Sequence, residues 1–187
     1  MPLADLSAAT GMLASANDSS VAYDLVLLAH VLSALAGMVA VVAAGGFALV
    51  LRAALLRGGP MPEALARYYR PGVNWVGRVL FAVPVFGVAL IAMSGGEWNW
   101  SDGWVLMGLA IWAVVAVVAE AVLWPGERTL QLVVADRAAT LPEPTPATDD
   151  GRGPVGADAA RCLQAGLVGI GLGAALLVVG FVMVVKP

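Results

Sequence analysis

The chain has 187 residues, of which 60% are hydrophobic and only 12% are charged, about half the charged fraction of a soluble domain. This composition excludes a soluble globular protein, and the net charge of −3 says little because the charges are segregated along the chain. A single cysteine, Cys162, excludes an intramolecular disulfide or a cysteine cluster for metal within one chain.

Four apolar stretches dominate the sequence, and each holds the ~20 apolar residues that a helix needs to cross ~30 Å of hydrocarbon. They cover residues 21–51, 73–93, 104–124 and 165–185. Because little chain remains outside them, we expect one all-α domain over residues 1–187. It would be a polytopic membrane protein, a bundle of four transmembrane helices with short cytoplasmic interfacial helices.

The first apolar stretch is preceded by residues 1–20, which contain no Lys or Arg and no continuous apolar run. They do not resemble a cleaved secretory signal, and we expect an external tail or a short amphipathic turn. The stretch itself is longer than a bilayer requires, so the helix must tilt, bend near Gly45-Gly46, or extend into the cytoplasm before Pro60 ends it.

Prolines punctuate the rest of the chain. Pro84 lies near the middle of the second stretch and should kink it, because proline lacks the backbone N–H of a regular helix. Pro125-Gly126 is expected to end the third stretch. We further expect a short helix over residues 63–69, an amphipathic helix on the inner membrane surface over residues 127–139, and a flexible cytoplasmic linker over residues 141–157.

All nine arginines lie in or beside the two loops that follow the first and third apolar stretches. The segment before the first stretch and the loop between the second and third contain acidic residues and no arginine. Excess Lys and Arg marks the cytoplasmic side of a membrane protein, so we expect both termini outside and both arginine-bearing loops inside a bacterial cytoplasmic membrane. The arginines are Arg52, Arg57, Arg67, Arg70 and Arg78 around the first loop and Arg128, Arg137, Arg152 and Arg161 around the last.

Small residues recur at helical spacing in the first and last stretches. Ser33 and Gly37 are one turn apart, and Gly169 and Gly173 form a Gly-x-x-x-Gly pattern. Helices in lipid approach closely across such faces, so we predict that these four residues pack helix against helix.

Four ionisable residues fall inside the apolar stretches: Asp24, His30, Arg78 and Glu120. Arg78 and Glu120 have the same predicted depth in adjacent spans, and pairing would offset the cost of removing each charge from water. We therefore predict an Arg78–Glu120 ion pair. A role in proton or substrate movement and an arginine that reaches lipid phosphate are the alternatives.

His30 is the only histidine of the chain. One histidine cannot supply a bis-histidine haem site in a monomer, so we expect a structural residue, hydrogen-bonded across a helix interface near Ser33, with no metal and no cofactor. The alternative is haem b or copper held by His30 and a methionine, for which Met38, Met93 and Met107 are candidates.

Several motifs resemble those of a bacterial family of four-span integral membrane proteins without an assigned function. They are the stretch Arg67-Tyr-Tyr-Arg-Pro-Gly-Val-Asn-Trp-Val-Gly-Arg78, Pro84-Val-Phe-Gly87, Asp102-Gly-Trp104 and Glu120-Ala-Val-Leu-Trp-Pro125. Leu28-Ala-His30 with Gly45-Gly46 is also similar to the membrane domain of copper-resistance protein D. Neither resemblance implies a catalytic residue.

The sequence predicts no catalytic site, and three function classes remain. The first is an accessory or scaffold subunit that packs against a larger, plausibly respiratory, membrane complex. The others are a redox or metal-handling bundle that uses His30, and a small oligomeric transporter or channel. The expected partners are the lipid bilayer and other membrane subunits or further copies of the chain, with no nucleic acid.

Overall fold

The computed structural model describes residues 3–58, 60–73, 75–139 and 154–185, with side chains from Ser20 in the first helix and from Val155 in the last. Every regular element in these ranges is helical. In chain order they are α1 (Leu3–Arg57), α2 (Glu63–Tyr68), α3 (Trp75–Arg78), the 3₁₀ turn η1 (Val79–Phe81), α4 (Ala82–Met93), α5 (Gly103–Val118), the π-helical turn η2 (Ala119–Leu123), α6 (Trp124–Ala139) and α7 (Pro154–Val185).

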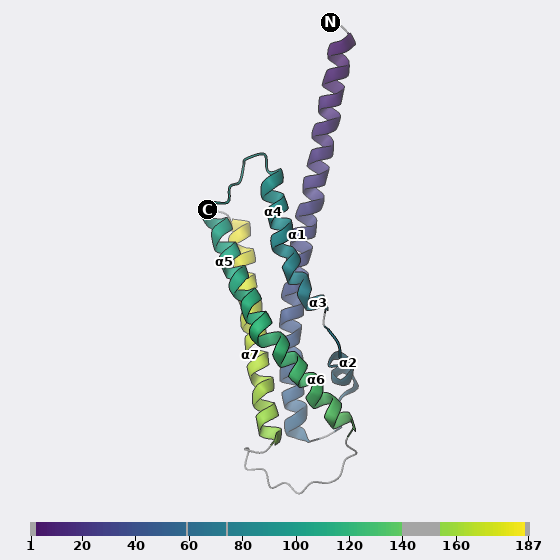
Figure 1. Ribbon diagram of the computed structural model, residues 1–187, viewed down its shortest axis with the longest axis vertical. Coiled ribbons are helices and arrows are strands. Elements are labelled where there is room, and N and C mark those ends of the chain that lie inside the picture. Colours follow the sequence, from purple (N-terminus) through teal and green to yellow (C-terminus); the bar gives the residue numbers. More distant parts are fainter. Residues whose placement is uncertain (1–2, 59, 74, 140–153, 186–187) are drawn as a thin grey trace.

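Four of the helical segments are long and apolar enough to cross a membrane, namely Ser20–Arg57, Trp75–Met93, Gly103–Ala139 and Val155–Val185. This confirms the predicted all-α bundle of four spans. Figure 1 shows the connection between α4 and α5 at the same end of the bundle as the end of α7. The last turn of α1, the helix α2, the end of α6 and the start of α7 lie at the opposite end, which we call the arginine end because Arg57, Arg67, Arg137 and Arg161 lie on these segments.

The first helix is a single rod of 55 residues, about 80 Å long at 1.5 Å per residue. It continues as one helix past Gly45-Gly46 and through Arg57. It ends at Gly58, whose φ of +68° closes the helix and brings its N–H to the Leu55 carbonyl at 3.3 Å. Its N-terminal part projects beyond the other helices (Figure 1), so the expected external tail is helical from Leu3.

The second span changes its helix type just before Pro84. The chain forms the 3₁₀ turn η1 over Val79–Phe81 and then resumes as α4. Proline cannot donate to the carbonyl four residues earlier, and a local 3₁₀ turn is one way in which a helix accommodates this loss. The predicted disturbance at Pro84 is therefore present, one turn on its N-terminal side.

The expected break at Pro125-Gly126 is wrong. The helix continues from α5 through the π-helical turn η2 into α6, so both residues lie inside a helix. A π turn spaces its hydrogen bonds five residues apart, so the helix can continue although Pro125 has no N–H to donate. The surface helix expected over residues 127–139 is therefore the continuation of the third span.

The last span begins earlier than predicted. Helix α7 starts at Pro154, so the final four residues of the linker expected over residues 141–157 are helical. A proline suits the first turn of a helix, where its missing N–H has no intrahelical partner anyway. The part of the linker call over residues 141–153 lies outside the described residues.

Buried side chains form two clusters along α1. One lies toward the arginine end and joins α1, α2, α6 and α7 through residues such as Leu51, Tyr69, Leu130 and Cys162. The other joins α1, η1, α5 and α7 around Val41, Leu80, Val115 and Leu172. Helix α1 is thus the central element, and it packs most extensively against α7 and next against α4.

Candidate functional site

Helices α1 and α7 approach each other at a contact that we call the glycine crossing, formed by Gly45, Gly166 and Gly169. A Cβ added to Gly45 would lie 2.9 Å from the Gly166 carbonyl oxygen, and one added to Gly169 would lie 2.7 Å from the Gly45 Cα. Both distances are too short for real atoms. The two backbones therefore meet only because these residues are glycine, as is typical of helix contacts in lipid.

The predicted packing residues divide between two partners. Gly169 lies in the glycine crossing, and Gly173 is close to Val42 of α1. Gly37 faces a different helix, because its added Cβ would lie 3.2 Å from the Cα of Leu80. Ser33 is buried, and its hydroxyl donates to the carbonyls of Ala29 and His30 in its own helix.

The proline of the second span removes the regular donor of one backbone carbonyl, and α5 supplies an additional one. Leu80 lies four residues before Pro84, so its carbonyl lacks the usual i+4 donor, although the Ala82 backbone N–H reaches it within the 3₁₀ turn. Trp112 donates its indole Nε1–H to the Leu80 oxygen at 3.0 Å, while its ring meets Phe81 edge-on at 6.1 Å. A buried carbonyl is thus satisfied by a side chain from another span.

His30 joins α1 to α4 through the same segment. Its Nδ1 lies 2.9 Å from the Val83 carbonyl oxygen, so the proton is on Nδ1 in the neutral ring. Gly87 faces the imidazole, since an added Cβ would lie 3.4 Å from His30 Cε1, in ordinary contact. We call these contacts of Leu80, Val83 and Gly87 the Pro84 region. The predicted cross-helix hydrogen bond of His30 has its partner in the backbone of α4, while Ser33 contacts only the His30 carbonyl.

The predicted Arg78–Glu120 ion pair is not formed. Glu120 is exposed, and ion pairs are seen instead between Arg67 and Glu63 and between Arg161 and Asp158. The Arg78 guanidinium instead lies over two indoles, 5.7 Å from the Trp75 ring and 5.2 Å from the Trp124 ring. The indole faces carry partial negative charge, which attracts the cation. The π turn η2, which contains Glu120, adds a residue to its turn and so changes which side chain of this span faces Arg78.

A small polar hollow lies beside Arg78 at the junction of α3 and α6. Its volume is about 10 Å³, and it is lined by Gly72, Val73, Arg78, Trp124, Glu127, Arg128 and Gln131. Gln131 fixes one wall because its amide donates to the Gly72 carbonyl at 3.3 Å. Sequence reasoning missed Trp124, Arg128 and Gln131 as members of one site. The i, i+4 and i, i+3 spacing of Trp124, Arg128 and Gln131 was the available signal.

Helix α2 is held against α1 by aromatic side chains next to this hollow. Tyr68 stacks on Phe47 at 4.0 Å between ring centroids and meets Tyr69 edge-on at 5.0 Å. Burial raises the pKa of both phenols, and the neighbouring Glu127 carboxylate raises the pKa of Tyr68 further. Both phenols therefore remain neutral through the physiological range.

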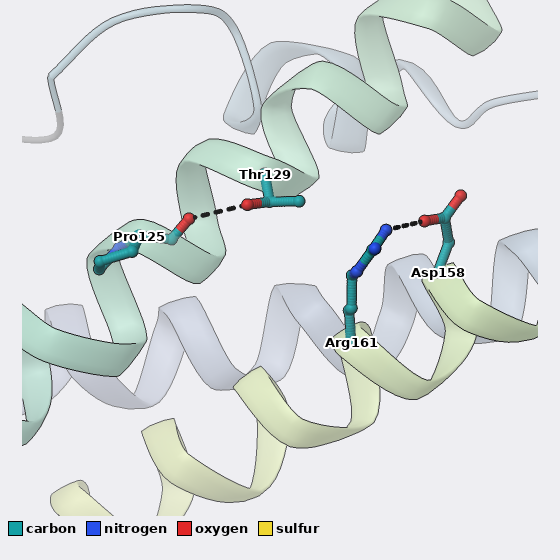
Figure 2. Close-up of polar contacts among 4 residues, drawn as sticks. All are labelled: Pro125, Thr129, Asp158 and Arg161. Carbon is teal, nitrogen blue, oxygen red and sulfur yellow. Dashed lines mark hydrogen bonds and ion pairs between the residues drawn. The ribbon is translucent and has the colours of Figure 1, made fainter.

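A second, open hollow of about 460 Å³ separates α6 from the first turns of α7. Figure 2 shows polar groups on its two sides, and the bonds drawn there stay within one helix. Thr129 donates to the Pro125 carbonyl at 3.1 Å, and Arg161 pairs with Asp158 at 2.8 Å. These polar groups therefore stabilise their own helices and leave the hollow unbridged by these bonds.

The remaining intramembrane candidates do not gather at one point. Asp24 is exposed, as are Met93 and Met107. Within the described part of the chain, no three His, Cys, Asp or Glu side chains converge as ligands for a metal ion. The geometry thus gives His30 a backbone partner, the Val83 carbonyl.

Comparison with protein-family models, with curated proteins and with solved structures finds no match for this chain. The two resemblances drawn from its motifs therefore stay predictions.

Proposed function

We propose that this chain is a non-catalytic subunit that packs against another protein of a larger membrane complex. The observation that carries this proposal is the outward face of α7. Residues at alternating spacings of four and three along it are all exposed: Ala160, Gln164, Leu167, Gly171, Ala174, Val178, Phe181 and Val185. This spacing is that of helices that pack side by side in left-handed bundles.

The glycines of α7 support a partner on this face. Gly169 is used inside the protein, whereas an added Cβ at Gly171 meets nothing within 4 Å. A glycine inside a helix costs about 0.5–1 kcal/mol relative to alanine. Lipid does not repay that cost, whereas a second helix that approaches the backbone closely does.

The proposed location is the bacterial cytoplasmic membrane, with the arginine end in the cytoplasm and both termini outside. The positive-inside rule supports this orientation. The four apolar helices fit a multi-pass protein whichever way it faces.

The test is purification in mild detergent with identification of bound proteins by mass spectrometry. We expect stoichiometric membrane-protein partners with the natural chain. Ala174→Leu adds bulk to the outward face of α7 and should release them. Ala110→Leu is the matched control, because Ala110 is equally classed as exposed but lies on α5.

The native mass and the visible spectrum of the same sample give the outcomes that would contradict the proposal. A monomer with no bound protein, or a release of partners by Ala110→Leu as well, contradicts the subunit function. A Soret band that disappears in His30→Ala would favour the alternative of a haem-binding bundle.

A further inference from the structure

The small hollow beside Arg78 is lined by two arginines and a tryptophan, together with Glu127 and Gln131. Neither Arg78 nor Arg128 has a carboxylate partner among the described residues. Trp124 is 7% exposed, and in the part of the chain that the structure describes its Nε1–H has no acceptor. Two arginines and one tryptophan thus border a space of about 10 Å³, close to the smallest volume that admits one water-sized group.

The charge of the lining favours an anion. Arg78 and Arg128 contribute two positive charges, and Glu127 contributes one negative charge. The Glu127 carboxylate also acts on the Tyr68 phenol of α2. The net charge of the lining is therefore about +1. A phosphate oxygen is the acceptor that guanidinium groups bind best, through charge-assisted hydrogen bonds.

The hollow lies where the second span begins. Trp75 is 71% exposed and Val76 is 62% exposed, so an indole and an apolar side chain project from the first turn of this membrane helix. Exposed tryptophan is typical of the headgroup region of a bilayer. Arg78 lies one turn further along the same helix, where its guanidinium can reach the headgroups.

We propose that this hollow binds the phosphate of an anionic phospholipid from the leaflet at the arginine end. Arg128, which is exposed, meets the phosphate first, and Arg78 with the Trp124 N–H binds an oxygen that enters the hollow. A zwitterionic choline headgroup fits less well, because its ammonium group would lie near two guanidinium groups. Basic pockets between membrane helices on the cytoplasmic side commonly hold acidic lipids in this way.

The test titrates the full-length protein in detergent with dioleoylphosphatidylglycerol and, separately, with dioleoylphosphatidylcholine, and measures bound lipid by native mass spectrometry. We expect one phosphatidylglycerol to bind at least about tenfold more tightly than phosphatidylcholine. Arg128→Gln removes one charged hydrogen bond and should weaken the phosphatidylglycerol complex about tenfold. Arg57→Gln is the matched control, because it removes an exposed arginine at the same end but outside the hollow.

Arg78→Lys sharpens the assignment, because lysine keeps the charge but loses the planar fork; we expect weaker binding than in the natural protein. If this variant does not fold, Arg128→Gln still decides, because its side chain is exposed. Equal binding of both lipids, or unchanged binding in Arg128→Gln, overturns the proposal. Complete displacement of phosphatidylglycerol by millimolar inorganic phosphate also overturns it, and assigns the hollow to free phosphate.

Discussion

The glycine crossing and the Pro84 region are two contacts of the same helix, α1, and they work by different means. At the glycine crossing, α7 comes so close that an added Cβ at Gly169 would lie 2.7 Å from the Gly45 backbone. In the Pro84 region, His30 and Trp112 reach the carbonyls of Val83 and Leu80. At the glycine crossing the absence of side chains brings two helices together, whereas in the Pro84 region side chains of two other helices donate to backbone carbonyls.

The largest effect is expected at the glycine crossing. Gly169→Ala places a methyl group against the Gly45 backbone, which cannot move aside as a flexible side chain could. We expect a loss of about 2–3 kcal/mol in the free energy of unfolding, measured by SDS titration in mixed micelles with circular dichroism. Gly171→Ala is the control on the same helix. It should be neutral or stabilising by up to about 1 kcal/mol, and equal losses in both variants would contradict a specific crossing.

The second effect isolates the hydrogen bond from Trp112 to the Leu80 carbonyl, which lacks its i+4 donor because of Pro84. Trp112→Phe keeps an aromatic ring beside Phe81 but removes the donor to Leu80, so we expect a loss of about 1–2 kcal/mol. In the Pro84→Ala background the restored backbone N–H can serve Leu80 instead. The cost of Trp112→Phe should then fall by at least half. An unchanged cost in that double-mutant cycle would show that the indole stabilises the protein by packing alone.

A smaller effect is expected at His30. Asparagine places its amide nitrogen near the position of Nδ1, so His30→Asn should retain the bond to Val83, whereas His30→Leu should lose about 0.5–1 kcal/mol. His30→Gln, whose amide extends one bond further, should lie between them. Thermal unfolding in detergent measures the series. A loss of stability in His30→Asn as large as that in His30→Leu would mean that the imidazole ring itself is required.

The smallest effect distinguishes the observed contacts of Arg78 from the predicted ion pair. Glu120 is exposed and Arg78 lies between two indoles, so Glu120→Gln should change the free energy of unfolding by less than about 0.5 kcal/mol. Trp124→Leu removes one indole from the cation and should cost clearly more. A Glu120→Gln loss that disappears in an Arg78→Met background would restore the ion pair.

The four spans could be predicted from sequence because the length of an apolar stretch decides whether it can cross a membrane. The disturbance near Pro84 could be predicted because a missing backbone N–H must alter a helix. Pro125 looked like a helix end only because a regular four-residue spacing was assumed; the π turn η2 provides another solution. The partner of Arg78 could not be predicted from depth. Residues at one depth face each other only if both helices have the right rotation, and one extra residue in a turn shifts that rotation by about 100°.

The two contacts of α1 also explain why small residues of one helix serve two neighbouring helices. Gly37 and Gly45 are eight residues apart, which on an ideal helix is a rotation of about 80°. Gly37 accordingly faces Leu80 of the second span, and Gly45 faces α7. Sequence spacing identified the small residues, but only the arrangement of the neighbouring helices assigns each one to a partner.

The most direct measurement of the whole arrangement is cysteine labelling in intact cells, because the orientation of the four spans underlies both the proposed subunit and the proposed lipid site. In a Cys162→Ser background, single cysteines replace Ser101, between α4 and α5, and Pro60, between α1 and α2. A membrane-impermeant maleimide should label Ser101→Cys directly and Pro60→Cys only after permeabilisation. The reverse pattern, or direct labelling of both, would contradict four spans with the arginine end in the cytoplasm.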